Sequence, residues 1–251
     1  MLDSTGGSRP AGTVQSLERA IDVLEALARA ERALGVGEVA EATRLPQGTV
    51  HRLLQTLQAR GYVRRAESRK YSLGTGAVRL GTAAQGALAR SARPHLAELV
   101  RLSGETANLA VLEGDDVVYV EQVSSPHTLR MFAEVGRHVP PHSTAVGKVL
   151  LAALPRDRVV ALLQRTGLPA RTPATITRVE DFLAELDRTL ERGWAADEEE
   201  QETGVRCVAA PVGRDGHVVA ALSVSGPADR FTTAVSDKLI PAIQEAGRQV
   251  G

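Results

Sequence analysis

Five side chains that can hydrogen-bond to the bases or phosphates of a nucleic acid lie close together in the chain: Gln47, Thr49, His51, Arg52 and Gln55. Apolar residues are interleaved with them at helical spacing: Val50, Leu53, Leu54 and Leu57. A helix from about Pro46 to Arg60 would therefore bury one face and leave the polar face free to enter the major groove of DNA.

Basic residues are concentrated around this segment. Residues 44–71 contain seven basic residues and one acidic residue. Four of the basic residues are expected to contact phosphates, one in the turn before the helix and three in a hairpin after it: Arg44, Arg64, Arg65 and Lys70. Phosphate contacts fix the orientation of a protein on DNA and make its binding depend on salt, without reading the base sequence. The alternative is a charged surface that faces only solvent.

The segment from Leu34 to Gly74 is predicted to form a short helix, a tight turn, a longer helix and two short strands. This order is typical of a winged helix-turn-helix, which is a DNA-binding module. Pro46 suits the first turn of the longer helix, and Gly61 is expected to end it. Because so small a unit has a small core, the rest of the chain is expected to support it.

Length and composition indicate a two-domain protein with aliphatic cores. The chain has 251 residues, of which 43% are hydrophobic and 3% aromatic. Residues 1–75 hold eleven Lys and Arg against eight Asp and Glu, and residues 76–251 hold 19 against 22, so the net charge is zero. No apolar run approaches the roughly 20 residues of a membrane span, and no secretory signal is recognised. A single cysteine excludes an internal disulfide. We therefore expect a cytoplasmic protein without a membrane partner.

A second group of residues could form a small polar site in the C-terminal two-thirds of the chain. Ser223 and Ser225 are two residues apart on a predicted strand, so both hydroxyls face the same side of a sheet. Cys207 lies on another predicted strand. Two hydroxyls, a thiol and the amides of a helix start would accept a small neutral molecule or an anion. Alternatively, the thiol is a small buried apolar group and the serines bond to the local backbone.

Catalysis is not expected. Cys207 or the pair His142–Ser143 could supply a nucleophile, but neither lies in a G-x-S-x-G turn. The histidines and the cysteine lack the spacing of metal ligands, and no Walker or dinucleotide-binding motif is present, so no cofactor is expected. The acidic run over residues 198–202 is interpreted as a solvated loop or as structural partners, not as a metal site.

The elements that must position these residues indicate an α+β protein in four parts. Residues 1–13 are predicted to be a disordered tail, and residues 14–75 a winged helix-turn-helix whose first helix is capped by Ser16. Residues 76–90 are predicted to form a linker helix, whose small residues would admit the same helix of a second subunit or pack on their own domain. Residues 91–251 are predicted to form an antiparallel sheet with helices packed on it.

The predicted elements of this last part follow from apolar periodicity and turn residues. Strands are predicted over residues 107–112, 117–122, 129–135, 205–212 and 217–225. Helices are predicted over residues 92–103, 144–154, 156–164, 179–192 and 228–249.

Three motifs occur in order after the predicted DNA-binding module: HSTAVGKVLLA at 142–152, GWAADEEEQETGVRCVAAPV at 193–212 and ALSVSGP at 221–227. Together with that module they resemble the IclR family of bacterial transcriptional regulators over nearly the whole chain. The resemblance implies a GAF-like effector-binding domain after the linker helix. It also implies a homodimer or homotetramer that binds a palindromic operator in double-stranded DNA.

The resemblance further implies an effector pocket on the sheet, lined by six residues: Ala145, Val146, Asp197, Cys207, Ser223 and Ser225. Some family members that bind small carboxylates have smaller residues where this chain has Val146. The effector of this chain is therefore expected to differ from glyoxylate and pyruvate or to be larger than they are. We therefore expect a regulator that responds to an organic acid or a related metabolite, and a repressor is favoured over an activator. The alternative is a sensory or protein-interaction module that does not bind DNA.

Overall fold

The computed structural model describes residues 14–30, 32–128, 134–214 and 217–251, so the predicted tail over residues 1–13 lies outside the described residues. The chain divides into two compact units, Met1–Ala84 and Gln85–Gly251. Within the described ranges, the helices are too short or too polar to cross a membrane.

The first unit contains the predicted helix-turn-helix and wing. Its elements are α1 (Gln15–Arg29), α2 (Val36–Thr43), α3 (Gln47–Ala59), β1 (Val63–Arg65) and β2 (Tyr71–Leu73), and β1 and β2 pair in antiparallel register. Arg44 adopts a left-handed conformation with φ 53° after α2, and Gly61 adopts φ 76° after α3. These two residues turn the chain where the sequence predicts that the helices end.

The core of the first unit is aliphatic, and it differs from the prediction in α1. Fully or nearly fully buried residues from all three helices and both strands form it: Val23, Leu27, Val39, Val50, Leu54, Leu57, Val63 and Tyr71. Leu17 and Ile21 lie at helical spacing with Leu24 and Leu27, but they are 60% and 46% exposed. Ser16 is not the cap of α1 either, because the helix begins after Val14 and has no side-chain cap.

The predicted linker helix and the helix predicted after it are a single helix, α4 (Thr75–Ser103). Pro94 lies inside α4 on an exposed position and removes one backbone donor without ending the helix. Gly104, at φ 73°, ends α4 by donating from its N–H to the carbonyl oxygen of Val100 at 2.7 Å.

The second unit is built on a six-stranded antiparallel sheet in the order β5-β4-β3-β8-β7-β6. The strands are β3 (Thr106–Glu113), β4 (Asp116–Val123), β5 (His138–Val139), β6 (Ala195–Glu198), β7 (Val205–Arg214) and β8 (His217–Pro227). The two edge strands, β5 and β6, were not predicted. The strand predicted over residues 129–135 falls largely outside the described residues.

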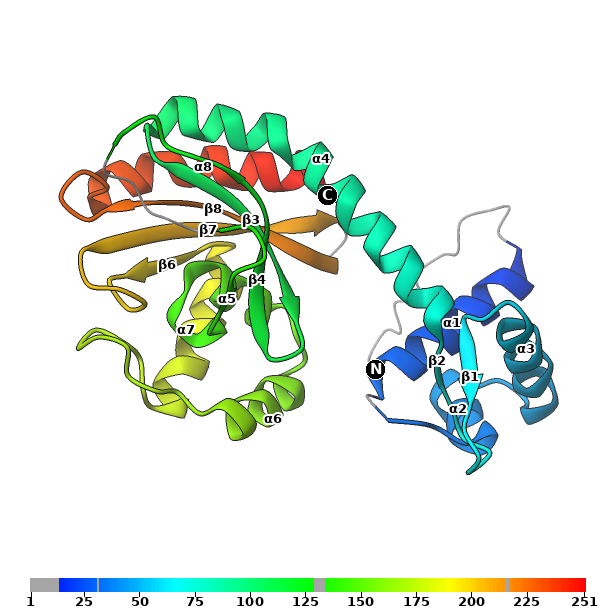
Figure 1. Ribbon diagram of the computed structural model, residues 1–251. Helices are drawn as coiled ribbons and strands as arrows, with labels where there is room; N and C mark the ends of the chain where they lie inside the picture. Colours follow the sequence, from blue (N-terminus) through cyan, green and yellow to red (C-terminus); the bar gives the residue numbers. More distant parts are fainter. Residues whose placement is uncertain (1–13, 31, 129–133, 215–216) are drawn as a thin grey trace, which may run out of the picture. The chain divides into compact units, whose positions relative to one another are not determined.

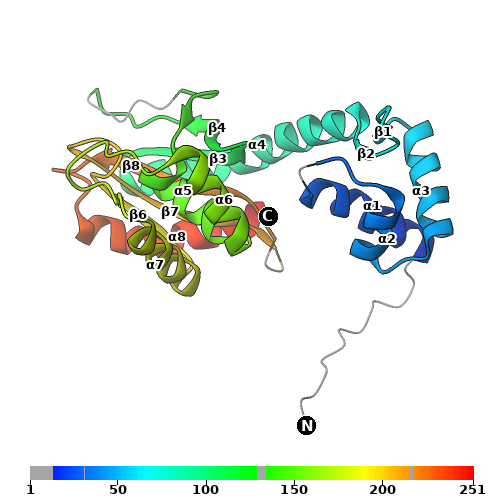
Figure 2. The ribbon, with the colours of Figure 1, turned by 90° about the horizontal axis from the view of Figure 1, so that it is seen from below.

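Helices cover both faces of this sheet (Figure 1). The C-terminal part of α4 and α8 (Thr233–Val250) pack on one face through Leu96, Leu99, Leu239 and Ile243. The short 3-10 helix η1 (Pro141–Ser143) leads into α5 (Ala145–Ala152), which packs on the other face. Figure 2 views the molecule from the side of α5, α6 (Arg156–Thr166) and α7 (Val179–Arg192).

The helices α6 and α7 form a small core with the end of α5. Leu151, Val159 and Phe182 are buried in it. Leu190 lies at helical spacing with Phe182, Leu183 and Leu186, but it is 67% exposed. Helical periodicity identifies an apolar face here, but the neighbouring elements cover only part of that face.

Candidate functional site

The first candidate site is the exposed face of α3. Four of the five α3 residues predicted to contact bases or phosphates are exposed and follow one another along one side of the helix: Gln47, His51, Arg52 and Gln55. Thr49, the fifth, is half-buried and lies at the edge of this side. The helix contains no acidic residue, so it has no carboxylate of its own to repel a phosphate backbone.

Two arginines at this site have unoccupied guanidinium groups. Arg44 is exposed in the turn before α3, and Arg52 is exposed in the first half of the helix. Neither side chain has a hydrogen-bond or ion-pair partner within the described ranges. Both are therefore free to donate to a base or a phosphate.

The wing residues are placed differently from one another, although all are exposed. The Arg64 Nε donates to Ser72 Oγ at 2.9 Å, and the guanidinium of Arg65 lies 5.7 Å from the centre of the Tyr71 ring. Lys70 Nζ lies 3.8 Å from a carboxylate oxygen of Glu38. The positive charge of Lys70 is thus partly neutralised by Glu38 of α2. Neither Arg64 nor Arg65 forms an ion pair with a described carboxylate.

The second candidate site lies on the sheet face that α5 covers. Alternation along β6, β7 and β8 directs four polar residues to this face, opposite the apolar residues that contact α4 and α8: Asp197, Cys207, Ser223 and Ser225. The strand register places Asp197 across from Cys207, and Cys207 across from Ser225. These side chains and Ser223 are all more than 90% buried. The four predicted effector residues of the sheet are therefore brought together.

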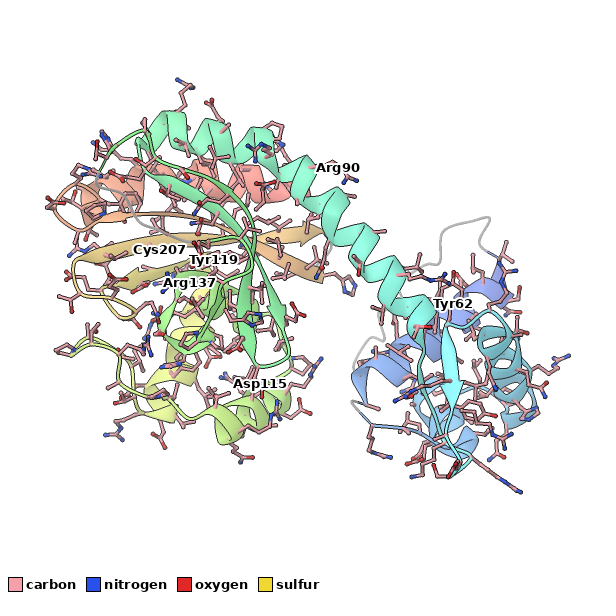
Figure 3. All side chains as sticks on the ribbon, viewed as in Figure 1. Tyr62, Arg90, Asp115, Tyr119, Arg137 and Cys207 are labelled. Atoms are coloured by element: carbon pink, nitrogen blue, oxygen red, sulfur yellow. The ribbon has the colours of Figure 1, made fainter. Side chains whose placement is uncertain are left out.

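The thiol of Cys207 is a neutral hydrogen-bonding group. The Ser225 hydroxyl donates to Cys207 Sγ at 3.1 Å. Burial raises the pKa of Cys207 to about 12, and the charge of Asp197 adds to this rise, while the hydrogen bond from Ser225 opposes it. Such a thiol is not a nucleophile near neutral pH. Cys207 and Tyr119 are labelled on this part of the sheet in Figure 3, and burial also raises the pKa of Tyr119.

Asp197 gains or loses its proton near neutral pH. Burial raises the pKa of Asp197 to about 7, and the carboxylate of Glu200 contributes to the rise. The backbone N–H groups of Glu200 and Gln201 donate to Asp197 Oδ1 at 2.7 and 3.3 Å, and these two hydrogen bonds lower the pKa of Asp197. A protonated Asp197 can donate a hydrogen bond to an anion, and an ionised one repels it.

A buried ion pair holds the loop after β6 against α5. Lys148, 2% exposed, donates from Nζ to Glu200 Oε1 at 2.5 Å and to the carbonyl oxygen of Ala196 at 2.9 Å. Burial raises the pKa of Glu200, while Lys148 lowers it. Because Glu200 also donates from its N–H to Asp197, this pair fixes the position of the Asp197 carboxyl group.

The start of α5 supplies backbone donors to the same face. Ala145 and Val146 are fully buried, and their N–H groups have no hydrogen-bond partner within the described ranges. The next two N–H groups are occupied, since Gly147 and Lys148 donate to Thr144 Oγ1 and to the Thr144 carbonyl oxygen. A Cβ atom on Gly147 would lie 2.1 Å from the carbonyl oxygen of Pro141, so the absence of a side chain lets α5 start there. Two free amides at a helix N-terminus favour an anion.

The enzymatic interpretation is not supported by the surroundings of His142 and Ser143. His142 Nε2 lies 3.0 Å from the carbonyl oxygen of Pro169, and burial lowers the pKa of its imidazole. The hydroxyl of Ser143 donates to Gln201 Oε1 at 2.5 Å. Each side chain bonds to a different loop rather than to the other. Across the part of the chain described, no group of three or more His, Cys, Asp and Glu residues could hold a metal ion.

Sequence reasoning missed the pairing of Lys148 with Glu200. The signal for Lys148 was present, because a lysine inside the run AVGKVLLA must be buried if that run packs on a sheet. For Glu200 no such signal exists, because it is one of several neighbouring glutamates. The interpretation of residues 198–202 as structural partners is correct for Glu200.

Comparisons with known proteins identify the family to which both units of the chain belong. Residues 16–67 match the family model described as the IclR helix-turn-helix domain, and residues 82–251 match the model described as the C-terminal domain of the bacterial transcriptional regulator IclR. The chain is 39% identical over 242 residues to the HTH-type transcriptional regulator KdgR of Escherichia coli (strain K12), covering 95% of this chain and 92% of KdgR. It is 38% identical over 228 residues to the transcriptional repressor IclR of the same organism, covering 88% and 83% of the two chains.

A solved structure extends the likeness to a ligand-bound protein. The crystal structure of an IclR homolog from Microbacterium hydrocarbonoxydans, complexed with 4-hydroxybenzoate, matches 94% of this chain and 97% of its own with a TM-score of 0.60 and 26% identity. The curated relatives are transcriptional regulators rather than enzymes. With both family models matched in order over most of its length, the chain belongs to the IclR family of bacterial transcriptional regulators.

Proposed function

We propose that this protein is a repressor that binds an inverted-repeat operator and that a small organic acid modulates its binding. The observation that carries this proposal is the presence of two separate polar sites, one in each unit. The α3 face offers free donors to bases, and the buried sheet face offers free donors to an anion. The effector would act by binding more tightly to one of two arrangements of the α3 helices, since only a difference in affinity can shift an equilibrium. The site of action would be the cytoplasm, where operator DNA is accessible.

A homodimer or homotetramer would place two α3 helices on two half-sites. Exposed apolar residues of the first unit support a subunit contact there. Val14, Leu17 and Ile21 follow one face of α1 and are 63%, 60% and 46% exposed, and Val78 and Leu80 of α4 are 67% and 60% exposed. Large apolar residues that stay exposed in a group, as at the start of α1, are expected where a second copy of the chain covers them.

We propose that Arg44, Arg64, Arg65 and Lys70 contact phosphates rather than bases. Arg65→Ala should then weaken binding to operator and unrelated DNA by the same factor, because a phosphate contact carries no sequence information. The slope of log K against log salt should fall by about 1 for each subunit. Fluorescence anisotropy titrations over a range of salt concentrations measure both quantities. Arg188→Ala, which removes an exposed arginine of α7, is the control and should leave the slope unchanged.

The effector site is tested by the double variant Ser223→Ala, Ser225→Ala. It should bind operator with unchanged affinity and lose its response to organic acids, because two hydroxyls are removed from the sheet face without a change of backbone. The response is measured as release of labelled operator by propionate, pyruvate, lactate, benzoate or 4-hydroxybenzoate. Ser236→Ala, at a buried serine of α8, is the matched control. A double variant that loses operator binding and keeps its response would contradict the assignment of the two sites.

A further inference from the structure

Two adjacent buried polar groups on the sheet face under α5 lack hydrogen-bond partners among the described residues. Asn108 of β3 lies directly across from Ser223 of β8 in the strand register, and both side chains are 0% exposed. Asn108 Oδ1 accepts from Gln122 Nε2 at 3.0 Å. In contrast, Asn108 Nδ2 and Ser223 Oγ form no hydrogen bond with any described residue. Native proteins rarely leave buried polar groups unpaired, because each one costs stability.

Strand alternation places Asn108 on the α5 side of the sheet. Its neighbours along β3, Ala107 and Leu109, belong to the core under α4 and α8, whereas Ala110 belongs to the cluster that contacts Ala145 of α5. The Gln122 bond fixes the orientation of the amide, since Oδ1 is occupied and Nδ2 is therefore the free end. Asn108 thus presents one fixed donor on the face that carries Ser223.

We infer that Asn108 is a specificity-determining residue of the effector site, whose Nδ2–H donates to a second oxygen of the effector beside its carboxylate. The inference rests on the proposed function, because it takes the sheet face under α5 as the effector site. The free groups of this face are mainly donors: the amides of Ala145 and Val146, the Asn108 amide and the Ser223 hydroxyl. Two amides at the start of α5 suit a carboxylate, and the remaining donors require another acceptor oxygen. The effector class is therefore a hydroxy or oxo acid rather than a simple carboxylate.

The test compares matched acids on the full chain and on variants of Asn108. Propionate is compared with pyruvate and lactate, and benzoate with 4-hydroxybenzoate. For each acid, the measured quantity is the rise that it causes in the melting temperature of the protein at neutral pH. In the natural protein, the acid with the second oxygen should give the larger rise within at least one matched set. Asn108→Leu should weaken binding of that acid roughly tenfold or more, to the level of the matched acid that lacks the second oxygen.

Two further variants separate this role from a general effect on folding. Asn108→Ala removes the donor and adds neither bulk nor charge, so it should lose the same discrimination even where Asn108→Leu is too unstable to measure. Thr189→Val removes another buried hydroxyl without a partner, on α7, and should keep the discrimination.

Each outcome separates this inference from the proposed function. If no acid raises the melting temperature of the natural protein, the effector site and the role of Asn108 are both wrong. If the acids raise it equally with and without the second oxygen, or if discrimination survives in both Asn108 variants, the effector site stands and the role of Asn108 is overturned.

Discussion

Replacing Lys148 by Met should destabilise the second unit by about 3–5 kcal/mol. The substitution keeps most of the side-chain volume but leaves Glu200 buried with no cation beside it. The pKa of Glu200, already raised by burial, would rise further, and the carboxyl group would take up a proton or draw in water. At about 2–4 °C per kcal/mol for a unit of this size, the melting temperature should fall by roughly 10 °C. Differential scanning calorimetry at pH 7 measures the change.

The control for Lys148 is an ion pair on the surface. Arg248 and Glu245 lie three residues apart on α8, with a 2.6 Å contact and side chains that are 66% and 53% exposed. Arg248→Met should cost less than about 1 kcal/mol, because solvent screens an exposed pair. The double variant Lys148→Met, Glu200→Met should recover much of the loss, since it removes both buried charges. An equal loss in Lys148→Met and Arg248→Met would show that the buried pair does not hold the loop.

Replacing Arg52 by Ala should remove most of the preference for operator over unrelated DNA. A bidentate contact from arginine to a guanine is worth roughly 1–3 kcal/mol of discrimination. Since the proposed dimer would make the contact in each half-site, the operator complex should lose about twice that amount. Binding to unrelated DNA should change little, because the proposed phosphate contacts of the wing would remain. Anisotropy titrations with operator and with a shuffled duplex, at one salt concentration, give the two affinities.

The matched control is Arg60→Ala, which removes an equal charge just after the other end of α3. Arg60 follows the last helical residue, away from the free donors near the start of the helix. It should therefore weaken binding to both duplexes slightly and keep the preference. Arg52→Ala with an unchanged preference, or Arg60→Ala with an equal loss of it, would exclude Arg52 as a base contact.

The helix-turn-helix could be predicted closely because its signals are local. Pro46 precedes α3, Gly61 follows it, and the apolar residues between them repeat at helical spacing, so the observed helix differs from the prediction by one residue at each end. Leu17 and Ile21 show the limit of this reasoning. Periodicity shows that α1 has an apolar face, but which element covers that face depends on contacts far away in the sequence.

The polar sheet face under α5 was less predictable, because it is assembled from residues that are distant in the chain. The spacing of Ser223 and Ser225 indicates a shared face, but the strand order that places Asp197 beside Cys207 depends on β6, which the sequence reasoning missed. Lys148 meets Glu200 across 52 residues, and no local pattern selects Glu200 among its neighbours. The continuous helix α4 was missed for a different reason, since Pro94 is tolerated on its exposed side.

Sequence-specific DNA binding by the full chain tests the central claim most directly. Duplexes selected by the protein from random DNA would give the operator, and anisotropy titrations at two salt concentrations would compare that duplex with a shuffled one. We expect an inverted repeat, a preference for it of roughly a thousandfold or more, and weaker binding to both duplexes at the higher salt concentration. Equal affinity for the two duplexes at both salt concentrations, or no selected sequence, would contradict the account.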